Sequence, residues 1–126
     1  MARLDHMIVP AHDKDASARF FARIFGLPYA GVQGPFAPVR LADGVTLDFD
    51  DHESFEVHHY AFEVSEQEFQ QIFGRIQAEG LPYGSMPWSA EDGKTNSMYG
   101  GPGVYFRDPN GHLLELLTRG PEPETR

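Results

Sequence analysis

The chain of 126 residues has the length of a single domain, and its 40% hydrophobic and 13% aromatic residues are typical of a globular protein with a packed core. The formal net charge of −9 argues against a nucleic-acid partner, because binding to a phosphate backbone needs clustered Lys and Arg. No apolar run reaches the roughly 18 residues of a membrane span, and there is no cysteine for a disulfide or a thiolate. Without an apolar stretch of signal-peptide length at the N-terminus, the composition fits a cytoplasmic protein.

The first part of the chain predicts a strand, a helix and further short strands. Residues 4–9 are an apolar run with strand character, and from Asp13 onward the apolar residues recur at helical spacing, with an Asp available as N-cap. Gly26 then stands where a helix-ending residue belongs, and Pro28 blocks continuation. Two or three short strand candidates follow, separated by turns that contain glycine, and the last of them covers residues 45–51.

The second part of the chain repeats this order. Residues 57–64 form a strand by composition, and Ser65 with Glu68 three residues later predicts a capping box at the start of a helix that Gly80 ends. A longer connection follows, and residues 103–118 then predict a hairpin around a DPNG turn.

The tetrapeptide GLPY closes both predicted helices, at positions 26–29 and again, 54 positions later, at 80–83. Each copy stands between a helix and the next strand, which indicates a duplicated unit. The sequence therefore predicts two β-α-β-β-β modules in tandem, at about 3–52 and 56–119, in one domain that spans residues 1–126 and has a flexible tail at 120–126. One helix and a few strands cannot bury both faces of a sheet, so the modules must pair within the chain or across a dimer.

Three stretches carry a resemblance to a known family: DHMIV opens the first module, HHYAFEV opens the second and YFRDPNGHLLELLT closes it. Over about residues 3–119, the chain resembles the vicinal oxygen chelate superfamily, which includes glyoxalase I, extradiol dioxygenases, methylmalonyl-CoA epimerase, fosfomycin-resistance thiol transferases and metal-free bleomycin-binding proteins. The resemblance implies an α+β glyoxalase/bleomycin-resistance/dioxygenase-like fold with a concave sheet cleft. It also implies a homodimer, with each site built from one chain or from two.

Strand parity indicates which side chains face the concave side of the sheets, because successive side chains of a strand point to opposite faces. In residues 57–64 the bulky apolar set should face the helix, which leaves His59 on the concave side. The same reasoning places Glu115 and Asp48 on that side of their strands. His6 precedes His59 by 53 positions, within one residue of the GLPY offset, so each module supplies one histidine and one carboxylate.

Glu115 lies in an otherwise apolar strand, where a charged residue must be paired or bound. One interpretation is an ion pair with Arg40 or Arg107 across the sheet. The module-equivalent positions favour the other, in which His6, His59 and Glu115 are the two-histidine, one-carboxylate ligand set of a divalent ion such as Fe²⁺, Mn²⁺, Ni²⁺ or Zn²⁺. The remaining histidines are interpreted as non-ligands: His12, His52, His58 and His112.

Asp48 leaves the number of protein ligands open. The resemblance implies a Glu at this position in glyoxalase-like members and a Gln in epimerases, but Asp is shorter by one carbon–carbon bond of about 1.5 Å. If Asp48 reaches the ion, two positions remain for an enediolate, with a carboxylate free to act as base. If it falls short, three positions remain, which suits fosfomycin-transferase or extradiol-dioxygenase chemistry. The shorter side chain favours three protein ligands.

Other residues are candidates for catalysis or substrate binding. Tyr105 could donate a proton to an oxygen at the metal, or could be a packed aromatic. Arg40 could hold a carboxylate or phosphate of the substrate, or lie in solvent, and Arg107 could line the cleft by parity. Trp88 and Tyr99 lie in a connection at 85–103 that is long enough for a lid, although disorder would explain the same composition.

Two functions from different classes remain. The first is a metal-dependent enzyme, with dioxygenase, glyoxalase/lyase or thiol-transferase chemistry, that chelates the vicinal oxygens of a small organic substrate. The second is a metal-free protein that sequesters a small molecule, as bleomycin-resistance proteins do. The joint presence of two histidines and a glutamate favours the enzyme, because a binding-only relative does not need them.

Overall fold

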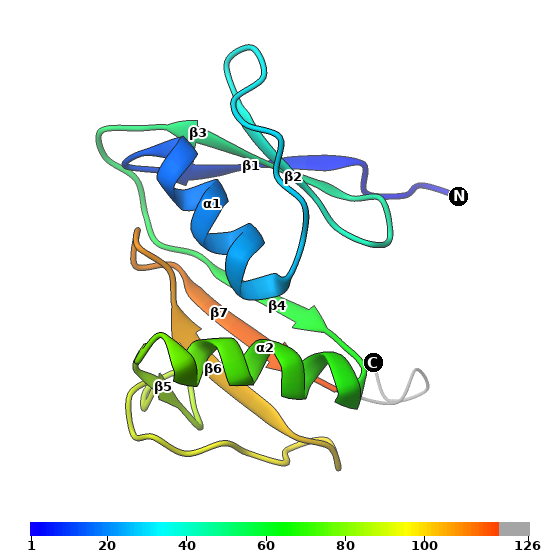
Figure 1. The fold of residues 1–126 in the computed structure, drawn as a ribbon, viewed down its shortest axis with the longest axis vertical. Helices are drawn as coiled ribbons and strands as arrows, with labels where there is room; N and C mark the ends of the chain where they lie inside the picture. The colour runs from blue at the N-terminus through cyan, green and yellow to red at the C-terminus, as the bar shows by residue number, and fades with distance from the viewer. Residues whose placement is uncertain (119–126) are drawn as a thin grey trace. The chain divides into compact units, whose positions relative to one another are not determined.

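Each half of the chain folds around one helix and one small sheet (Figure 1). The computed structural model describes residues 1–118, and the flexible tail predicted at 120–126 lies outside the described residues. The chain divides into two compact units, Met1–Glu56 and Val57–Arg126, which are called unit 1 and unit 2 below. Two mixed sheets with one helix each confirm the predicted α+β class with tandem modules. Within residues 1–118, no helix is both long enough and apolar enough to cross a membrane.

Unit 1 contains β1 (His6–Ala11), α1 (Lys14–Phe25), β2 (Ala37–Arg40) and β3 (Thr46–Asp51). The central strand, β3, pairs parallel with β1 and antiparallel with β2. The first strand was predicted from residue 4 but begins at His6, because its pairing with β3 starts with His6 opposite Thr46. Of the two or three strands predicted after the helix, two form, and Gln33 and Phe36 make an isolated bridge before them.

The α1 helix covers one face of the unit 1 sheet. Asp13 caps the helix by accepting a hydrogen bond from the Ala16 N–H at 3.1 Å. Phe21 of α1 meets Phe49 of β3 with ring centroids 5.9 Å apart, and both are buried. Toward α1, buried strand residues alternate with half-buried or exposed ones, and the buried set is Val9, Ala11, Ala37, Val39, Leu47 and Phe49. The intervening side chains form a helix-free face. That face carries His6, Ile8, Pro38, Arg40, Thr46 and Asp48.

Unit 2 contains β4 (His59–Glu63), α2 (Glu66–Ala78), β5 (Tyr83–Gly84), β6 (Gly103–Arg107) and β7 (Leu113–Leu117). The strand order is β4-β7-β6-β5, with β4 parallel to β7 and the other pairs antiparallel. The predicted capping box is present, since the Ser65 hydroxyl accepts from the Glu68 N–H and the Glu68 carboxylate accepts from the Ser65 N–H, each at 3.1 Å. Buried side chains of α2, including Phe69, Ile72 and Ile76, form the core with the sheet.

The two GLPY copies make the same helix end in both units. Gly26 and Gly80 adopt left-handed φ angles of 70° and 67°, which a residue with a Cβ rarely takes. The residue after each glycine then donates its N–H five positions back along the helix, Leu27 to the Ala22 carbonyl at 2.9 Å and Leu81 to the Ile76 carbonyl at 3.1 Å. The repeated tetrapeptide therefore encodes one helix-stop geometry twice.

Candidate metal centre

A histidine and a glutamate meet on the helix-free face of unit 2. The pairing of β4 with β7 puts Ala61 opposite Glu115 and His59 opposite Leu113, so His59 and Glu115 are diagonal neighbours. The His59 Nε2 atom lies 2.9 Å from the Glu115 Oε1 atom. Glu115 is only 8% exposed, whereas the His59 side chain is 45% exposed, so the imidazole is the solvent-accessible side of the pair.

The phenol of Tyr105 faces the same carboxylate. Tyr105 stands directly opposite Glu115 in the pairing of β6 with β7, and its ring centroid lies 5.8 Å from that of His59. Burial, followed by the negative charge of Glu115 and a hydrogen bond to it, raises the pKa of Tyr105 to about 12. Tyr105 therefore keeps its proton at neutral pH and holds it beside the carboxylate.

The separation of the His59 and Glu115 donor atoms fits two adjacent ligands of one divalent ion. With metal–ligand distances of about 2.0–2.2 Å, two ligands at a right angle stand about 2.8–3.1 Å apart. Within the described part of unit 2, the alternative ion pair with Arg107 does not form, because Glu115 contacts the imidazole of His59. Arg107 instead donates a hydrogen bond to the Gly111 carbonyl at 2.9 Å.

His6 offers a second imidazole, on the helix-free face of unit 1. Its Nδ1 atom lies 2.8 Å from the Asp5 Oδ2 atom, and this hydrogen bond raises the pKa of His6. In the neutral ring, a proton on Nδ1 that is directed at Asp5 leaves the Nε2 lone pair available, as in metal-binding histidines oriented by a carboxylate. Asp48 lies on the same face, opposite Ile8 of β1.

Each unit by itself holds only part of the predicted ligand set. Among residues 1–118, no three His, Asp or Glu side chains gather closely enough to hold a metal ion. Unit 2 joins His59 to Glu115, while unit 1 holds His6 with Asp5 and carries Asp48 on the same face as His6. The three-ligand set and the role of Asp48 draw on residues of both units and remain predictions.

The comparisons with known proteins agree with the fold. Residues 3–116 match the Glyoxalase/Bleomycin resistance protein/Dioxygenase superfamily. The chain belongs to this superfamily. It is similar to the solved structure of Oxidase ChaP-H2, with 50% identity, coverage of 96% of both chains and a TM-score of 0.91. Oxidase ChaP-H1 is 45% identical over 95% of this chain and 98% of its own, with a TM-score of 0.90.

Fosfomycin-resistance proteins are more distant relatives within the superfamily. The glutathione transferase FosA of Serratia marcescens is 27% identical, and the match covers 90% of this chain and 78% of FosA. A variant of FosX from Listeria monocytogenes, solved with Mn(II) and a dihydroxypropylphosphonic acid, shares 21% identity over 97% of this chain and 94% of its own, with a TM-score of 0.72, which shows the fold. The superfamily relatives therefore include enzymes, namely two oxidases and a glutathione transferase.

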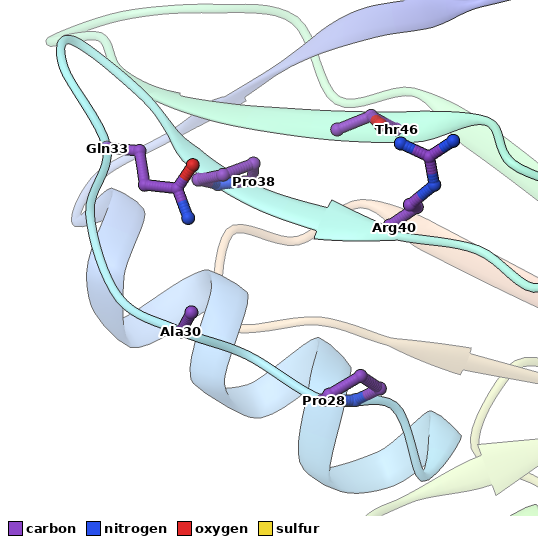
Figure 2. A pocket seen from close by; sticks show the side chains of 6 residues that line it. All are labelled: Pro28, Ala30, Gln33, Pro38, Arg40 and Thr46. Atoms are coloured by element: carbon purple, nitrogen blue, oxygen red, sulfur yellow. The ribbon is translucent and has the colours of Figure 1, made fainter.

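Three of the four predicted substrate-binding residues line one of two cavities. Arg40 lines a cavity of about 380 Å³ in unit 1 (Figure 2). Arg107 and Trp88 line a cavity of about 330 Å³ in unit 2, and the Trp88 side chain is 81% exposed. Tyr99 is also exposed and lines neither of these two cavities. Their roles in substrate binding remain predictions.

The connection between β5 and β6 is held against the unit 2 sheet. Ser85 donates hydrogen bonds to Asp92 through its N–H at 3.0 Å and its hydroxyl at 2.5 Å, and the Asn96 amide donates to the Ser85 carbonyl at 2.9 Å. Ala90 packs with the buried Tyr105 and Leu113. These contacts hold residues 85–96 against the sheet, and the lid predicted at 85–103 remains a prediction.

The sequence analysis did not predict the structural roles of two residues near the candidate ligands, His112 and Asp5. His112, which was predicted to be a non-ligand at a turn, is fully buried, and its Nδ1 atom accepts the His58 N–H at 3.0 Å. It thereby ties the residue before His59 to the start of β7. The second residue is Asp5, which forms a hydrogen bond with His6. Its position next to His6 in the sequence could have indicated this role.

Proposed function

We propose that this chain is a divalent-metal-dependent oxidase that binds a small organic substrate through the substrate's vicinal oxygens. The observation that carries the proposal is the His59–Glu115 pair, in which a nearly buried carboxylate contacts an imidazole and no arginine among the described residues of unit 2. A buried carboxylate without a strong cation partner is costly unless it is bound. The 50% identity to Oxidase ChaP-H2 supports the oxidase class.

In this proposal the metal ligands are His59 and Glu115 from unit 2 and His6 from unit 1. The His6 donor comes from the same chain or from the second chain of a homodimer. A bound Fe²⁺, Mn²⁺, Ni²⁺ or Zn²⁺ would polarise the substrate oxygens, and iron or manganese would also support electron transfer to an oxidant. The Asp5 carboxylate orients His6, because its hydrogen bond to Nδ1 leaves Nε2 free to act as the donor atom.

Tyr105 and Asp48 handle protons in the proposed site. Since its pKa is raised to about 12, Tyr105 remains a hydrogen-bond donor to the oxyanion of a bound substrate at neutral pH. Asp48 is half-buried on the helix-free face of unit 1 and accepts the proton that the substrate hydroxyl loses on binding. With Asp48 as base, three protein ligands remain, which leaves room for two substrate oxygens and an oxidant.

A thiol-transferase activity is the second candidate, because FosA of Serratia marcescens matches 90% of this chain. Its identity to the chain is 27%, against 50% for the oxidase, so the oxidase is favoured. The activity screen therefore pairs oxygen uptake on catechol-type substrates with fosfomycin plus a thiol and with glutathione hemithioacetal.

The proposal is tested by elemental analysis after anaerobic reconstitution of the untagged protein. We expect one divalent ion per chain in the wild type, loss of the ion in Glu115→Gln, and retention in the control Glu66→Gln, which changes an exposed glutamate at the start of α2. Asp48→Ala should keep the ion and lose activity if three protein ligands are used. A Glu115→Gln protein with a full complement of metal would refute the ligand assignment, and a wild type that binds no ion would favour the metal-free binding function. Light scattering on the same samples checks the expected homodimer.

A further inference from the structure

The cavity beside Arg40 has the features of a subsite for an acidic group. We propose that it binds the carboxylate of a flat, otherwise apolar substrate, and that Arg40 selects for the acid over its neutral analogue. This inference rests on the proposed function for its biological setting, because it names the substrate class of the same enzyme. Its physical basis lies entirely within unit 1 and does not depend on a metal.

The walls of the cavity are apolar, and the polar groups stand at its ends. Its volume of about 380 Å³ lies in the range of small-molecule sites, about 300–1,000 Å³. Figure 2 shows Pro28 and Ala30 on the connection that runs beside β2, with Pro38 and Arg40 on the strand itself. The proline rings and the alanine methyl are rigid apolar contacts, which can pack on the face of a planar molecule. Polar groups come from Gln33, Arg40 and Thr46.

Arg40 is free to bind an anion. Within residues 1–118, no hydrogen bond or ion pair joins its guanidinium to another group, and the side chain is exposed. Arg3 lies close by, since Arg3 and Arg40 each place a guanidinium nitrogen 3.7 Å from the point where a Cβ on Gly44 would stand. The pKa of Asp5 is lowered chiefly by its hydrogen bond to His6, and both arginines contribute to the lowering through their charge.

The charge of the whole chain narrows the class of anion. Arg3 and Arg40, together with the Asp5 carboxylate that both charges reach, leave a local excess of one positive charge in a protein whose net charge is −9. A guanidinium binds a carboxylate through two parallel hydrogen bonds. A doubly charged phosphate would be repelled more strongly by the excess negative charge than a singly charged carboxylate. The carboxylate is therefore the expected group.

The wall of the cavity is fixed before any ligand binds. Tyr29, between the wall residues Pro28 and Ala30, donates its hydroxyl to the Asp15 Oδ1 atom at 2.6 Å. The Lys14 ammonium donates to the Pro35 carbonyl at 2.9 Å. Both bonds anchor the connection to α1, so little conformational entropy is lost when a ligand enters.

Strand register sets the direction in which the substrate extends. Thr46 of β3 stands opposite both His6 of β1 and Arg40 of β2, so these three residues form one row across the helix-free face. Strands lie about 4.8 Å apart, which separates the backbones of His6 and Arg40 by about 10 Å. An acid held at Arg40, with chelating oxygens near His6, therefore needs a planar body about as long as a fused pair of rings.

The test measures the binding of two probes to the chelator-treated, full-length protein by calorimetry. The probes are 2-naphthoate and the neutral 2-naphthamide, which share a ring system and differ in charge. We expect the wild type to bind the acid about tenfold more tightly than the amide, because a charge-assisted pair adds to the shared apolar contact. Arg40→Gln should abolish this preference. Lys94→Gln removes one positive charge from an exposed position in unit 2 and should keep it.

Equal affinities for the acid and the amide in the wild type would overturn the inference, as would an unchanged preference in Arg40→Gln. Loss of the preference in Lys94→Gln as well would show that overall charge, and not the cavity, attracts the acid. Because no metal is present in this assay, its outcome is independent of the elemental analysis. If the protein binds metal but does not prefer the acid, only the proposed subsite is refuted. If it prefers the acid but binds no metal, only the proposed metal-dependent activity is refuted.

Discussion

Gly84 offers the sharpest test of how the β5–β6 connection supports the site. Gly84 is buried in β5, and a Cβ built on it would lie 1.9 Å from the Ser89 carbonyl oxygen and 2.4 Å from the Ala90 carbonyl carbon. Both neighbours are backbone atoms, so no side-chain rotation relieves the overlap. Ordinary contact begins at 3.4 Å, so Gly84→Ala must move the connection by about 1.5 Å, the difference between 3.4 and 1.9 Å.

That displacement lifts Ala90 away from Tyr105 and Leu113 and strains the hydrogen bonds between Ser85 and Asp92. Overpacking of this kind costs about 1–3 kcal/mol, and each weakened hydrogen bond adds about 0.5–1.5 kcal/mol. With two such hydrogen bonds, Gly84→Ala should therefore lower the free energy of unfolding by about 2–6 kcal/mol. Urea denaturation followed by circular dichroism measures this change.

Gly74→Ala is the matched control. Gly74 lies within α2, and a Cβ built on it would meet no atom within 4 Å. Replacing a helical glycine by alanine in open space should stabilise the protein by about 0.5–1 kcal/mol. The two substitutions are chemically identical and should have opposite signs. A Gly84→Ala protein as stable as the wild type would refute the packing of the connection on the sheet.

Two further predictions concern a buried phenol and a helix cap. The pKa of Tyr105 is raised to about 12, above the pKa of about 10 of an unfolded tyrosine. The stabilisation that this phenol provides is therefore complete below pH 10 and is lost as the pH rises toward 12. Ultraviolet titration of the wild type against Tyr105→Phe should assign one late-ionising phenol to this residue, and ionisation near pH 10 would contradict its burial. Ser65→Ala removes one bond of the capping box and should lower the free energy of unfolding by about 0.5–2 kcal/mol in urea denaturation. Ser97→Ala, at an exposed position where the side chain makes no hydrogen bond within residues 1–118, should leave it unchanged, and equal effects of the two would argue against the cap.

The position of Tyr105 connects the stability predictions with the proposed chemistry. The Ala90 contact that Gly84 permits is one of the contacts that bury this phenol, and its burial is the main cause of the raised pKa. A displaced connection should therefore bring the Tyr105 pKa closer to its usual value. The same ultraviolet titration, applied to Gly84→Ala, measures whether loop packing sets the protonation of the proposed hydrogen-bond donor.

Local patterns in the sequence determined the elements and their faces. The two GLPY copies specify a left-handed glycine after each helix, and the Ser65–Glu68 pair specifies a helix start, because both depend only on residues within about one helical turn. Alternation along the strands placed His59 and Glu115 on the face away from α2, since neighbouring side chains of a strand must point to opposite sides. The family motifs likewise identified the superfamily.

Contacts between distant parts of the chain required the tertiary structure. The 2.9 Å approach of His59 to Glu115 depends on the register of two parallel strands, and the burial of His112 depends on the same pairing. The Arg40 cavity exists because a connection with no regular secondary structure folds back beside β2 and is anchored to α1. Register and loop path minimise the free energy of the whole packed unit, and no short stretch of residues carries that information.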